Sequence, residues 1–353
     1  MVKTYANKRL KVVEMGVTVI VGGAFGDEGK GKVAAYLALA DKPEAAVRTG
    51  AINAGHTVTY RGRTWKLRTI STAFVCKTTK IFVPPGALTR IDIFLKEVEE
   101  TETRGRVWID EKTGIIEERH VRMERENEYL MKVIGSTGQG VGAAMMERVL
   151  RVLKLARDFP ELKEYVTDTV AKVHEIIDRG GLVLIEGTQG TFLSLYHGTY
   201  PYVTSRDVTA SGILSEVGIG PKKVTDVVLV FKAYWTRVGA GELPGELPPE
   251  EAAKRGWIEY GTVTGRPRRV APFNVEWAKR AIMLNSPTQI AITKLDALFP
   301  DAKGKRRWED LPVEARKWIE DLENQLKVPI TLIGTGEEAE DMVDRRRDVF
   351  GPQ

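Results

Sequence analysis

Five apolar segments of strand length constrain the fold of this chain most strongly. Each is nearly continuous in apolar residues and is followed by glycine or a polar residue. A strand that is apolar on both sides must be covered on both sides, which is typical of parallel sheets packed between helices. The segments are residues 17–21, 182–186, 226–231, 289–293 and 330–333.

Helical patterns alternate with these segments, which predicts an α/β fold with a mostly parallel central sheet covered by helices. A binding crevice is expected at the carboxyl ends of the strands. Residues 107–120 are expected to form a hairpin that turns at 112–114 and leaves the main sheet. The predicted helices are residues 32–40, 90–100, 141–159, 161–179 and 275–285.

Chain length and linkers bear on the domain organisation. At roughly 150 residues per domain, 353 residues correspond to about two domains. The sequence contains no repeat and no low-complexity linker. We therefore expect one large α/β domain with insertions over residues 16–353, and an N-terminal extension over residues 1–15.

Composition excludes some classes of function. The net charge is +5, and 48 acidic residues are interspersed with 53 basic ones, which favours a small anionic substrate over nucleic acid. Cys76 is the single cysteine, so an intrachain disulfide is excluded. No apolar run approaches the roughly 20 residues of a membrane span, and no signal peptide is recognisable. A cytoplasmic enzyme without membrane or nucleic-acid partners is expected.

The stretch FGDEGKGK (25–32) resembles a phosphate-binding loop that departs from the usual formula. Gly29 and Lys30 fit, but Gly31 replaces the hydroxyl residue that normally holds magnesium. A helix that begins here would direct amide donors at an anion, so we expect the α/β fold to be P-loop-NTPase-like. Asp27 and Glu28 would repel phosphate unless one of them binds Mg²⁺ or handles a proton. A plain structural turn remains the alternative.

Glycine-rich and polar loops follow other predicted elements. His56 lies in RTGAINAGHTV (48–58), either as a surface residue or as a catalyst. Loops at 134–142 and 185–205 have the composition of binding loops, and a turn that merely connects two elements is an equal alternative for 134–142. Arg266, Arg268 and Arg269 form a compact cationic cluster that either faces solvent or closes over carboxylates or phosphates.

A short motif for base recognition follows the buried segment 289–293. Residues 293–296, TKLD, resemble the guanine-reading motif of GTP-binding proteins. The carboxylate of Asp296 can accept hydrogen bonds from both guanine N1–H and the exocyclic amine, whereas adenine lacks these donors.

Together these stretches resemble the adenylosuccinate synthetase family. The matching motifs occur in the family's order from residue 26 to residue 336: GDEGKGK, NAGHT, STGQG, EGTQGTFL, HGTYPYVTS, KAYWTRVGAG, VTGRPRR, TKLD and GTG. The resemblance implies a GTP-dependent ligase that uses Mg²⁺ and works as a homodimer. It would join L-aspartate to IMP through a 6-phosphoryl-IMP intermediate, giving adenylosuccinate, GDP and phosphate.

The resemblance also implies residue roles. Asp27 would be the base that takes the IMP N1 proton and a Mg²⁺ ligand together with the carbonyl of Gly55. His56 would be the acid that stabilises the moving phosphoryl group, and Lys30 would neutralise charge. Arg151 would reach the IMP phosphate of the neighbouring subunit.

Three binding sets follow from the resemblance. For IMP they are Asp27, Glu28, Gly29, Lys30, Asn53, Ala54, Gly55, His56, Thr137, Arg151, Gln189, Thr204, Val238 and Arg266. For aspartate they are Thr262, Val263, Thr264, Gly265, Arg266 and Arg268. For GTP they are Gly26, Gly29, Lys30, Gly31, Lys32, Gly55, His56, Thr57, Arg268, Lys294, Leu295, Asp296, Gly334, Thr335 and Gly336.

The chain departs from the family pattern in places. It is shorter than the usual bacterial members after Arg151 and between TKLD and GTG, Gln139 replaces an arginine, and Pro267 interrupts an arginine run. These departures leave the role of Arg151 and the dimer geometry open. Two rival classes are a regulatory GTPase, which needs no IMP, and a nucleic-acid-binding protein, whose binding would depend on salt.

Overall fold

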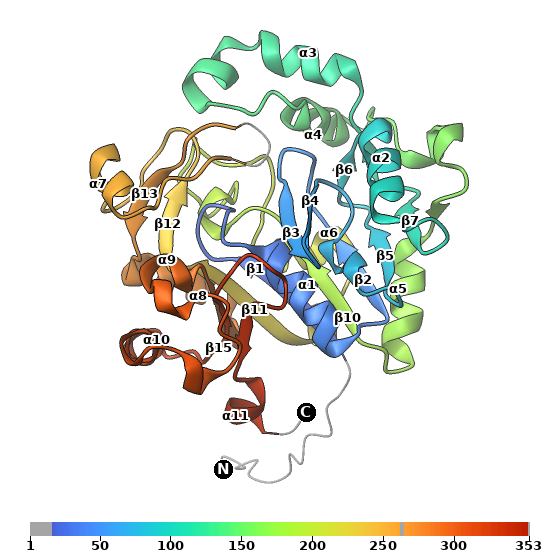
Figure 1. The fold of residues 1–353 in the computed structure, drawn as a ribbon. Coiled ribbons are helices and arrows are strands. Elements are labelled where there is room, and N and C mark those ends of the chain that lie inside the picture. Colours follow the sequence, from blue (N-terminus) through green and yellow to red (C-terminus); the bar gives the residue numbers. More distant parts are fainter. Residues whose placement is uncertain (1–15, 262–264, 352–353) are drawn as a thin grey trace, which may run out of the picture.

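A ten-stranded sheet runs through the centre of the molecule (Figure 1). The structure is a computed structural model that describes residues 16–261 and 265–351. Neighbouring strands are parallel except for the pair of β15 and β16, as the sequence predicts. In spatial order the strands are β16 (Met342–Asp344), β15 (Ile330–Gly334), β14 (Gln289–Thr293), β11 (Val224–Lys232), β1 (Val17–Gly22), β10 (Val183–Glu186), β2 (Ala45–Arg48), β5 (Lys80–Val83), β7 (Val107–Asp110) and β9 (Val166–Thr167).

The five apolar segments predicted from the sequence form β1, β10, β11, β14 and β15, so those predictions are confirmed. All residues of β10, β14 and β15 are buried. The N-terminal strand β1 lies between β10 and β11, where Val17 is paired with both Val183 and Val224. The phosphate-binding loop therefore begins at the middle of the sheet.

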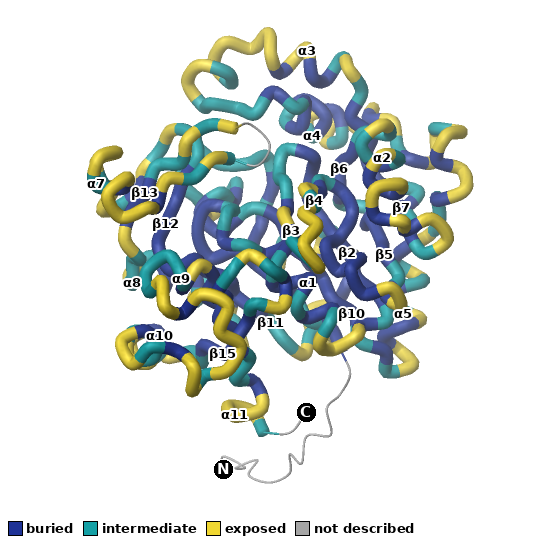
Figure 2. Tube along the Cα trace, in the orientation of Figure 1, coloured by how far each residue is buried: buried dark blue, intermediate teal, exposed yellow. Residues whose placement is uncertain are grey.

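Helices cover both faces of the sheet, and alternate residues of β1 point to opposite faces. Val19 belongs to the apolar cluster that includes α5 (Thr169–Asp178), α6 (Ala210–Val217), α8 (Val275–Asn285) and α10 (Val313–Leu326). Ile20 belongs to the cluster that includes α1 (Lys30–Asp41) and α2 (Ile91–Thr101). Figure 2 shows the buried strands at the centre, with exposed segments around them.

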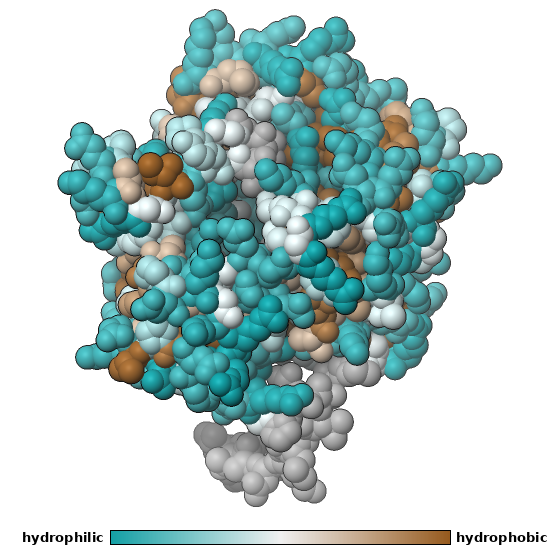
Figure 3. Space-filling view, viewed as in Figure 1, coloured by the Kyte–Doolittle hydropathy of each residue, from teal (hydrophilic) through white to brown (hydrophobic). Residues whose placement is uncertain are grey.

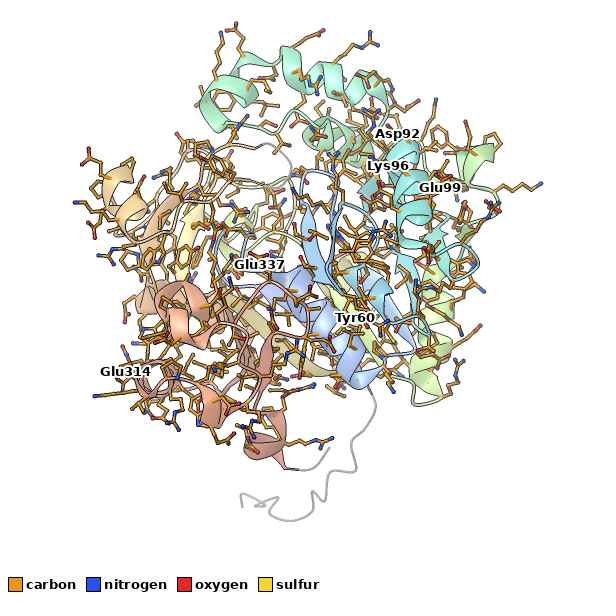
Figure 4. The ribbon with its side chains drawn as sticks, viewed as in Figure 1. Tyr60, Asp92, Lys96, Glu99, Glu314 and Glu337 are labelled. Carbon is orange, nitrogen blue, oxygen red and sulfur yellow. The ribbon has the colours of Figure 1, made fainter. Side chains whose placement is uncertain are left out.

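The helix α2 illustrates how an amphipathic sequence covers the sheet. Phe94 and Val98, four residues apart, are buried, whereas Asp92, Lys96 and Glu99 are exposed and lie along the helix in Figure 4. A spacing of three to four residues places side chains on one side of a helix. Such helices give the face drawn in Figure 3 its largely hydrophilic surface.

The predicted hairpin at residues 107–120 is wrong. β7 joins the main sheet in parallel with β5 and β9. After the turn, β8 (Gly114–Ile115) pairs in parallel with β6 (Leu88–Thr89) and does not return along β7. A hairpin does occur elsewhere, where β3 (His56–Tyr60) pairs with β4 (Arg63–Leu67).

Two predicted helices are shorter than expected. The helix predicted over 141–159 is α4 (Val141–Leu150), and it ends because Arg151 adopts a left-handed conformation with φ of 65°. The helix predicted over 161–179 begins only at Thr169, where the Asp168 side chain accepts a hydrogen bond from the Ala171 amide. The preceding residues form short 3₁₀ turns.

The remaining elements lie mostly around the edges of the sheet. No helix in residues 16–261 and 265–351 is long and apolar enough to cross a membrane. The other regular elements are α3 (Glu118–Glu126), a π-helical turn (Tyr129–Ile134), β12 (Tyr234–Arg237), α7 (Pro249–Lys254), β13 (Arg269–Pro272), α9 (Leu295–Leu298) and α11 (Arg346–Phe350). The 3₁₀ turns are Thr72–Val75, Ala156–Asp158, Pro160–Leu162, Thr191–Leu193, Pro221–Lys223, Pro300–Ala302 and Trp308–Asp310.

Candidate active site

The loop after β1 is shaped by an internal carboxylate. Glu28 accepts hydrogen bonds from the amides of Ala24 at 3.0 Å and Gly26 at 2.7 Å. Its other oxygen lies 2.7 Å from Lys30 Nζ, and both charged side chains are 1% exposed. Gly29 has a φ of 88° and precedes α1, whose first turn has no capping side chain among the described residues. Glu28 thus holds the loop together, and the helix start is open to an anion.

The glycine that replaces the usual hydroxyl residue has a packing reason. A Cβ atom on Gly31 would lie 2.9 Å from the Cβ of His56 and 3.1 Å from a methyl carbon of Thr72. These separations are too short for a serine or threonine without movement of β3. The same close contact places His56 against the beginning of α1.

His56 begins β3 and is only 4% exposed, so the alternative of a surface histidine is wrong. Its Nδ1 is hydrogen-bonded to Glu186, which also accepts hydrogen bonds from Ser71 Oγ at 2.6 Å and the Thr72 amide at 2.8 Å. Burial, aided by the nearby Arg48 guanidinium, lowers the pKa of His56 to about 4. Its Nε2 is buried and has no hydrogen-bond partner among the described residues.

Asp27 lies within the loop, in a cluster of partly buried and buried charges. The Thr236 hydroxyl donates a hydrogen bond to Asp27 Oδ2. Lys232 Nζ is 3.6 Å and Arg268 Nε is 3.4 Å from the same oxygen. Glu259 accepts hydrogen bonds from both of these cations, and its pKa is lowered to about 2 because their charges outweigh the effect of burial.

A cavity of about 430 Å³ opens beside Asp27. Its walls come from the loop after β1, from the segments that follow β2, β10 and β12, and from the loop between the π-helical turn and α4. Nine of the residues predicted for IMP line it: Asp27, Asn53, Ala54, Gly55, Thr137, Gln189, Thr204, Val238 and Arg266.

A second group of predicted residues lies around Lys32, in the first turn of α1. Lys32 Nζ donates hydrogen bonds to the carbonyls of Gly336 at 2.6 Å and Asp341 at 2.9 Å. Burial lowers the pKa of Lys32 to about 8, although Asp341 and Asp296 favour its charge. Asp296 Oδ1 is buried without a hydrogen-bond partner among the described residues. This suits a carboxylate that accepts hydrogen bonds from a nucleobase.

The loop that carries Gly336 crosses the β3–β4 hairpin. The Ala339 amide donates to the Thr59 carbonyl at 2.7 Å, and Figure 4 shows Glu337 above the hairpin residue Tyr60. The loop that contains Gly336 and Ala339 is therefore hydrogen-bonded to β3, the strand that begins with His56.

The described end of the predicted aspartate-binding loop contacts the segment that precedes α4. Arg266 donates hydrogen bonds to the carbonyls of Gly135 at 2.7 Å and Ser136 at 3.0 Å. Gly265 has a left-handed φ of 64°. The predicted residues Thr262, Val263 and Thr264 lie outside the described residues. Arg269, the third arginine of the cluster, pairs with Glu246 on the surface.

Comparison with known proteins identifies the family. The family model for adenylosuccinate synthetase matches residues 19–159 and 152–302. A curated adenylosuccinate synthetase from Archaeoglobus fulgidus is 49% identical over 335 residues, which cover 95% of this chain and 99% of the relative. One from Methanocaldococcus jannaschii is 48% identical over 343 residues, which cover 96% and 99%.

The chain belongs to the adenylosuccinate synthetase family.

The reaction of the adenylosuccinate synthetase family is the GTP-dependent ligation of IMP and L-aspartate. The family assignment decides against a regulatory GTPase and a nucleic-acid-binding protein as the class of this chain. Since both archaeal matches span 99% of the relative, the short length of this chain is shared with them.

Solved structures agree on the fold of this adenylosuccinate synthetase family member. The fully ligated adenylosuccinate synthetase of Plasmodium falciparum superposes with a TM-score of 0.84 at 24% identity, covering 93% of this chain and 99% of that chain. The succinoaminodeoxyadenylate synthetase of cyanophage S-2L, bound to dGMP and dATP, gives 0.76 at 25% identity, covering 93% and 95%.

Some residues expected from the family lie away from the cavity. Arg151 is exposed at the end of α4 and does not line the cavity. Thr57 is exposed, and Leu295 is fully buried. Glu28 and Lys30 are buried and form an ion pair with each other.

Sequence reasoning missed several residues that the structure places at the site. The apolar segment 182–186 predicts only a strand that ends at Glu186, and the sequence motifs assign no chemistry to Thr236, Lys232 or Glu259. Glu124 of α3 also lines the cavity, with one carboxylate oxygen bonded to Ser136 and the other buried without a partner among the described residues. A polar residue at the end of a buried strand was the available signal for Glu186 and Lys232.

Proposed function

We propose that this chain joins L-aspartate to IMP at the expense of GTP, with Asp27 as base and His56 as acid. The observation that carries the proposal is that the phosphate-binding loop contains Asp27 and that His56 packs against Gly31, where α1 begins. Asp27 lines the cavity, and His56 presents beside the start of α1 a buried Nε2 that has no hydrogen-bond partner within the described part of the chain.

The proposed reaction has two steps. Asp27 takes the N1 proton of IMP, and the 6-oxygen forms a bond to the γ-phosphorus of GTP as the bond to the leaving GDP oxygen breaks. The aspartate amine then attacks C6 and gives up one proton, and phosphate leaves with the 6-oxygen. Phosphorylation is useful because a carbonyl oxygen is a poor leaving group, whereas phosphate departs readily.

The imidazole of His56 is suited to charge that develops during transfer. Its lowered pKa, about 4, makes it neutral in this state, with Nε2 as an acceptor. An anionic phosphoryl group at Nε2 would favour the imidazolium, whose second N–H donates to the phosphoryl oxygen. The carboxylate of Glu186 stabilises that cation from the opposite side of the ring.

The site suits Mg²⁺. We propose Asp27 and the Gly55 carbonyl as its protein ligands, since both line the cavity. Magnesium is usually held by one or two carboxylates together with phosphates and water, so a larger cluster of acidic ligands is not needed. The ion would neutralise charge on the transferring phosphoryl group.

GTP and aspartate are proposed to occupy the neighbouring surfaces. The guanine would meet Asp296, Lys294 and the Gly334–Gly336 loop, with the phosphates at the start of α1. The α-carboxylate and side-chain carboxylate of aspartate would meet Arg266 and Arg268. A homodimer in which Arg151 reaches the neighbouring site, and a cytoplasmic location, remain predictions from the family resemblance.

The direct test uses the purified full chain with IMP, L-aspartate, GTP and Mg²⁺. We expect adenylosuccinate and GDP in equal amounts, and no adenylosuccinate when any one component is omitted. GTP hydrolysis at an unchanged rate without IMP and aspartate would instead favour a regulatory GTPase.

A further inference from the structure

We propose that Lys232 and Thr236 form a relay of two hydrogen bonds that positions Asp27 for its role as base, an inference that rests on the proposed function. Lys232 Nζ donates to Thr236 Oγ1, and the same hydroxyl donates to Asp27 Oδ2. Neither Lys232 nor Thr236 is among the residues assigned above to substrate, metal or nucleotide.

The chemistry of the three groups fixes the direction of the relay. An ammonium group has donors and no acceptor, and a threonine hydroxyl has a single proton. Because Lys232 occupies an acceptor position of Thr236 Oγ1, the hydroxyl proton is left for the carboxylate of Asp27. A positive charge behind the hydroxyl strengthens this hydrogen bond to an ionised acceptor.

The relay is built on rigid elements, while its target lies on a loop. Lys232 ends β11 and is 3% exposed, and Thr236 lies in β12 and is fully buried. Asp27 lies in the bend between β1 and α1, 209 residues before Thr236 in the sequence. Two strands thus determine where one oxygen of the loop carboxylate lies.

The second cation near Asp27 is placed differently. Arg268 Nε is 3.4 Å from Asp27 Oδ2, but this arginine is itself proposed to bind aspartate. A substrate carboxylate that draws Arg268 toward itself would leave the strand residues Lys232 and Thr236 as the fixed contacts of Asp27. Glu259, 3.0 Å from Lys232 Nζ, keeps the ammonium in position throughout.

A purely structural role for Thr236 makes a different prediction. Valine has nearly the shape of threonine and lacks only the hydroxyl, so a packing residue would tolerate Thr236→Val. Serine keeps the hydroxyl and loses a methyl group, so a packing residue would suffer more from Thr236→Ser. The two substitutions therefore separate positioning from packing.

The test compares the full-length wild type, T236V and T236S under the complete assay conditions. We expect kcat of T236V to fall about 10- to 100-fold, as for the loss of a hydrogen bond to a charged group. The KM values for GTP and aspartate should change by less than about threefold, since those substrates contact other residues. T236S should recover most of the lost kcat.

Two further measurements complete the test. Calorimetric titration with IMP alone should give T236V an affinity within about threefold of wild type, which separates positioning from substrate binding. T331V is the matched control, because Thr331 is a fully buried strand threonine whose hydroxyl donates to Gln289 away from the site. It should lose thermal stability and keep its kcat.

The outcomes are distinguishable. Failure of the wild type to make adenylosuccinate would overturn the proposed function itself. With an active wild type, a normal kcat in folded T236V would overturn the relay. Loss of IMP affinity without loss of kcat at saturation, or a folded T236S that remains as slow as T236V, would also overturn it.

Discussion

The imidazole of His56 is held by the carboxylate of Glu186, 130 residues later in the chain. Both side chains are buried, at 4% and 0% exposure. Glu186 is itself fixed by Ser71 and by the backbone of Thr72, so it cannot turn away from the ring. Because Nδ1 is engaged, Nε2 has one fixed direction.

Glu186→Gln should lower kcat by about 10- to 100-fold with little change in the KM for GTP. A glutamine keeps the shape but supports an imidazolium less well, and general acid–base groups typically contribute about 10²–10⁴-fold. The measurement is steady-state kinetics of the folded variant at saturating IMP and aspartate.

Glu97→Gln is the control for this variant. Glu97 is also buried, but its carboxylate accepts hydrogen bonds from the amides of Arg68, Thr69 and Ile70. It should lower the midpoint of thermal unfolding without a comparable loss of kcat. Equal losses of kcat in both variants would show that Glu186 has no specific relation to His56.

Asp296→Asn should erode the preference for GTP and favour xanthosine triphosphate. Asparagine can direct its NH₂ at the xanthine C2 carbonyl while its oxygen accepts from N1–H. Lost hydrogen bonds to a buried charged acceptor cost about 1–3 kcal/mol, so kcat/KM ratios should change tenfold or more. The measurement is kcat/KM for GTP, ATP and xanthosine triphosphate, with the variant Asp301→Asn at an exposed position as control. If Asp296→Asn ranks the three nucleotides as wild type does, Asp296 does not recognise the nucleobase.

Binding of GTP should weaken as the pH rises through about 8. Burial lowers the pKa of Lys32 to about 8, so the folded protein loses this charge there. Between this pH and about 10.4, Lys32 is protonated in the unfolded chain but not in the folded protein, so its contribution to the free energy of unfolding rises with pH. Over the same range its attraction for phosphate falls.

The measurement is calorimetric titration with GTP between about pH 7 and 9.5. In Lys32→Arg the charge persists over this range, so the affinity of that variant should be nearly constant. A parallel decline in wild type and Lys32→Arg would assign the pH dependence to another group.

Arg151→Leu should weaken IMP binding, and mixing this variant with Asp27→Ala should restore some activity. If Arg151 completes the neighbouring site, a mixed dimer has one site with both defects and one with neither. Exposed Arg157→Leu mixed with Asp27→Ala is the control and should behave as wild type mixed with Asp27→Ala. No recovery, with subunit exchange verified, would place the action of Arg151 within its own chain.

The central strands were predictable because their sequence is apolar on both faces. β2, β5 and β9 were missed because they are two to four residues long and carry weak patterns. The turn at Lys112 exists, but Asp110 accepts hydrogen bonds from the Thr169 amide and hydroxyl. β9 therefore pairs with the edge of β7 where a hairpin partner would lie. The residues around the turn do not indicate this contact, because β9 is distant in the sequence.

The site residues that lie in loops with family motifs were predictable from the sequence. Residues whose role depends on their burial were less predictable. Asp27 and Gln189 lie in such loops and line the cavity. The burial of His56 depends on Gly31 and Glu186, which are distant in the sequence, so a glycine-rich turn alone could not indicate it. Thr236 was missed because its partner Asp27 is 209 residues away.

The position of β1 has a consequence for how the chain is made. This strand is synthesised well before its neighbours β10 and β11, which begin at Val183 and Val224. Its apolar residues remain without their partners until about half of the protein has been synthesised. Such distant pairing slows folding and exposes strand edges in the meantime, so the nascent chain should depend on chaperones for protection from aggregation.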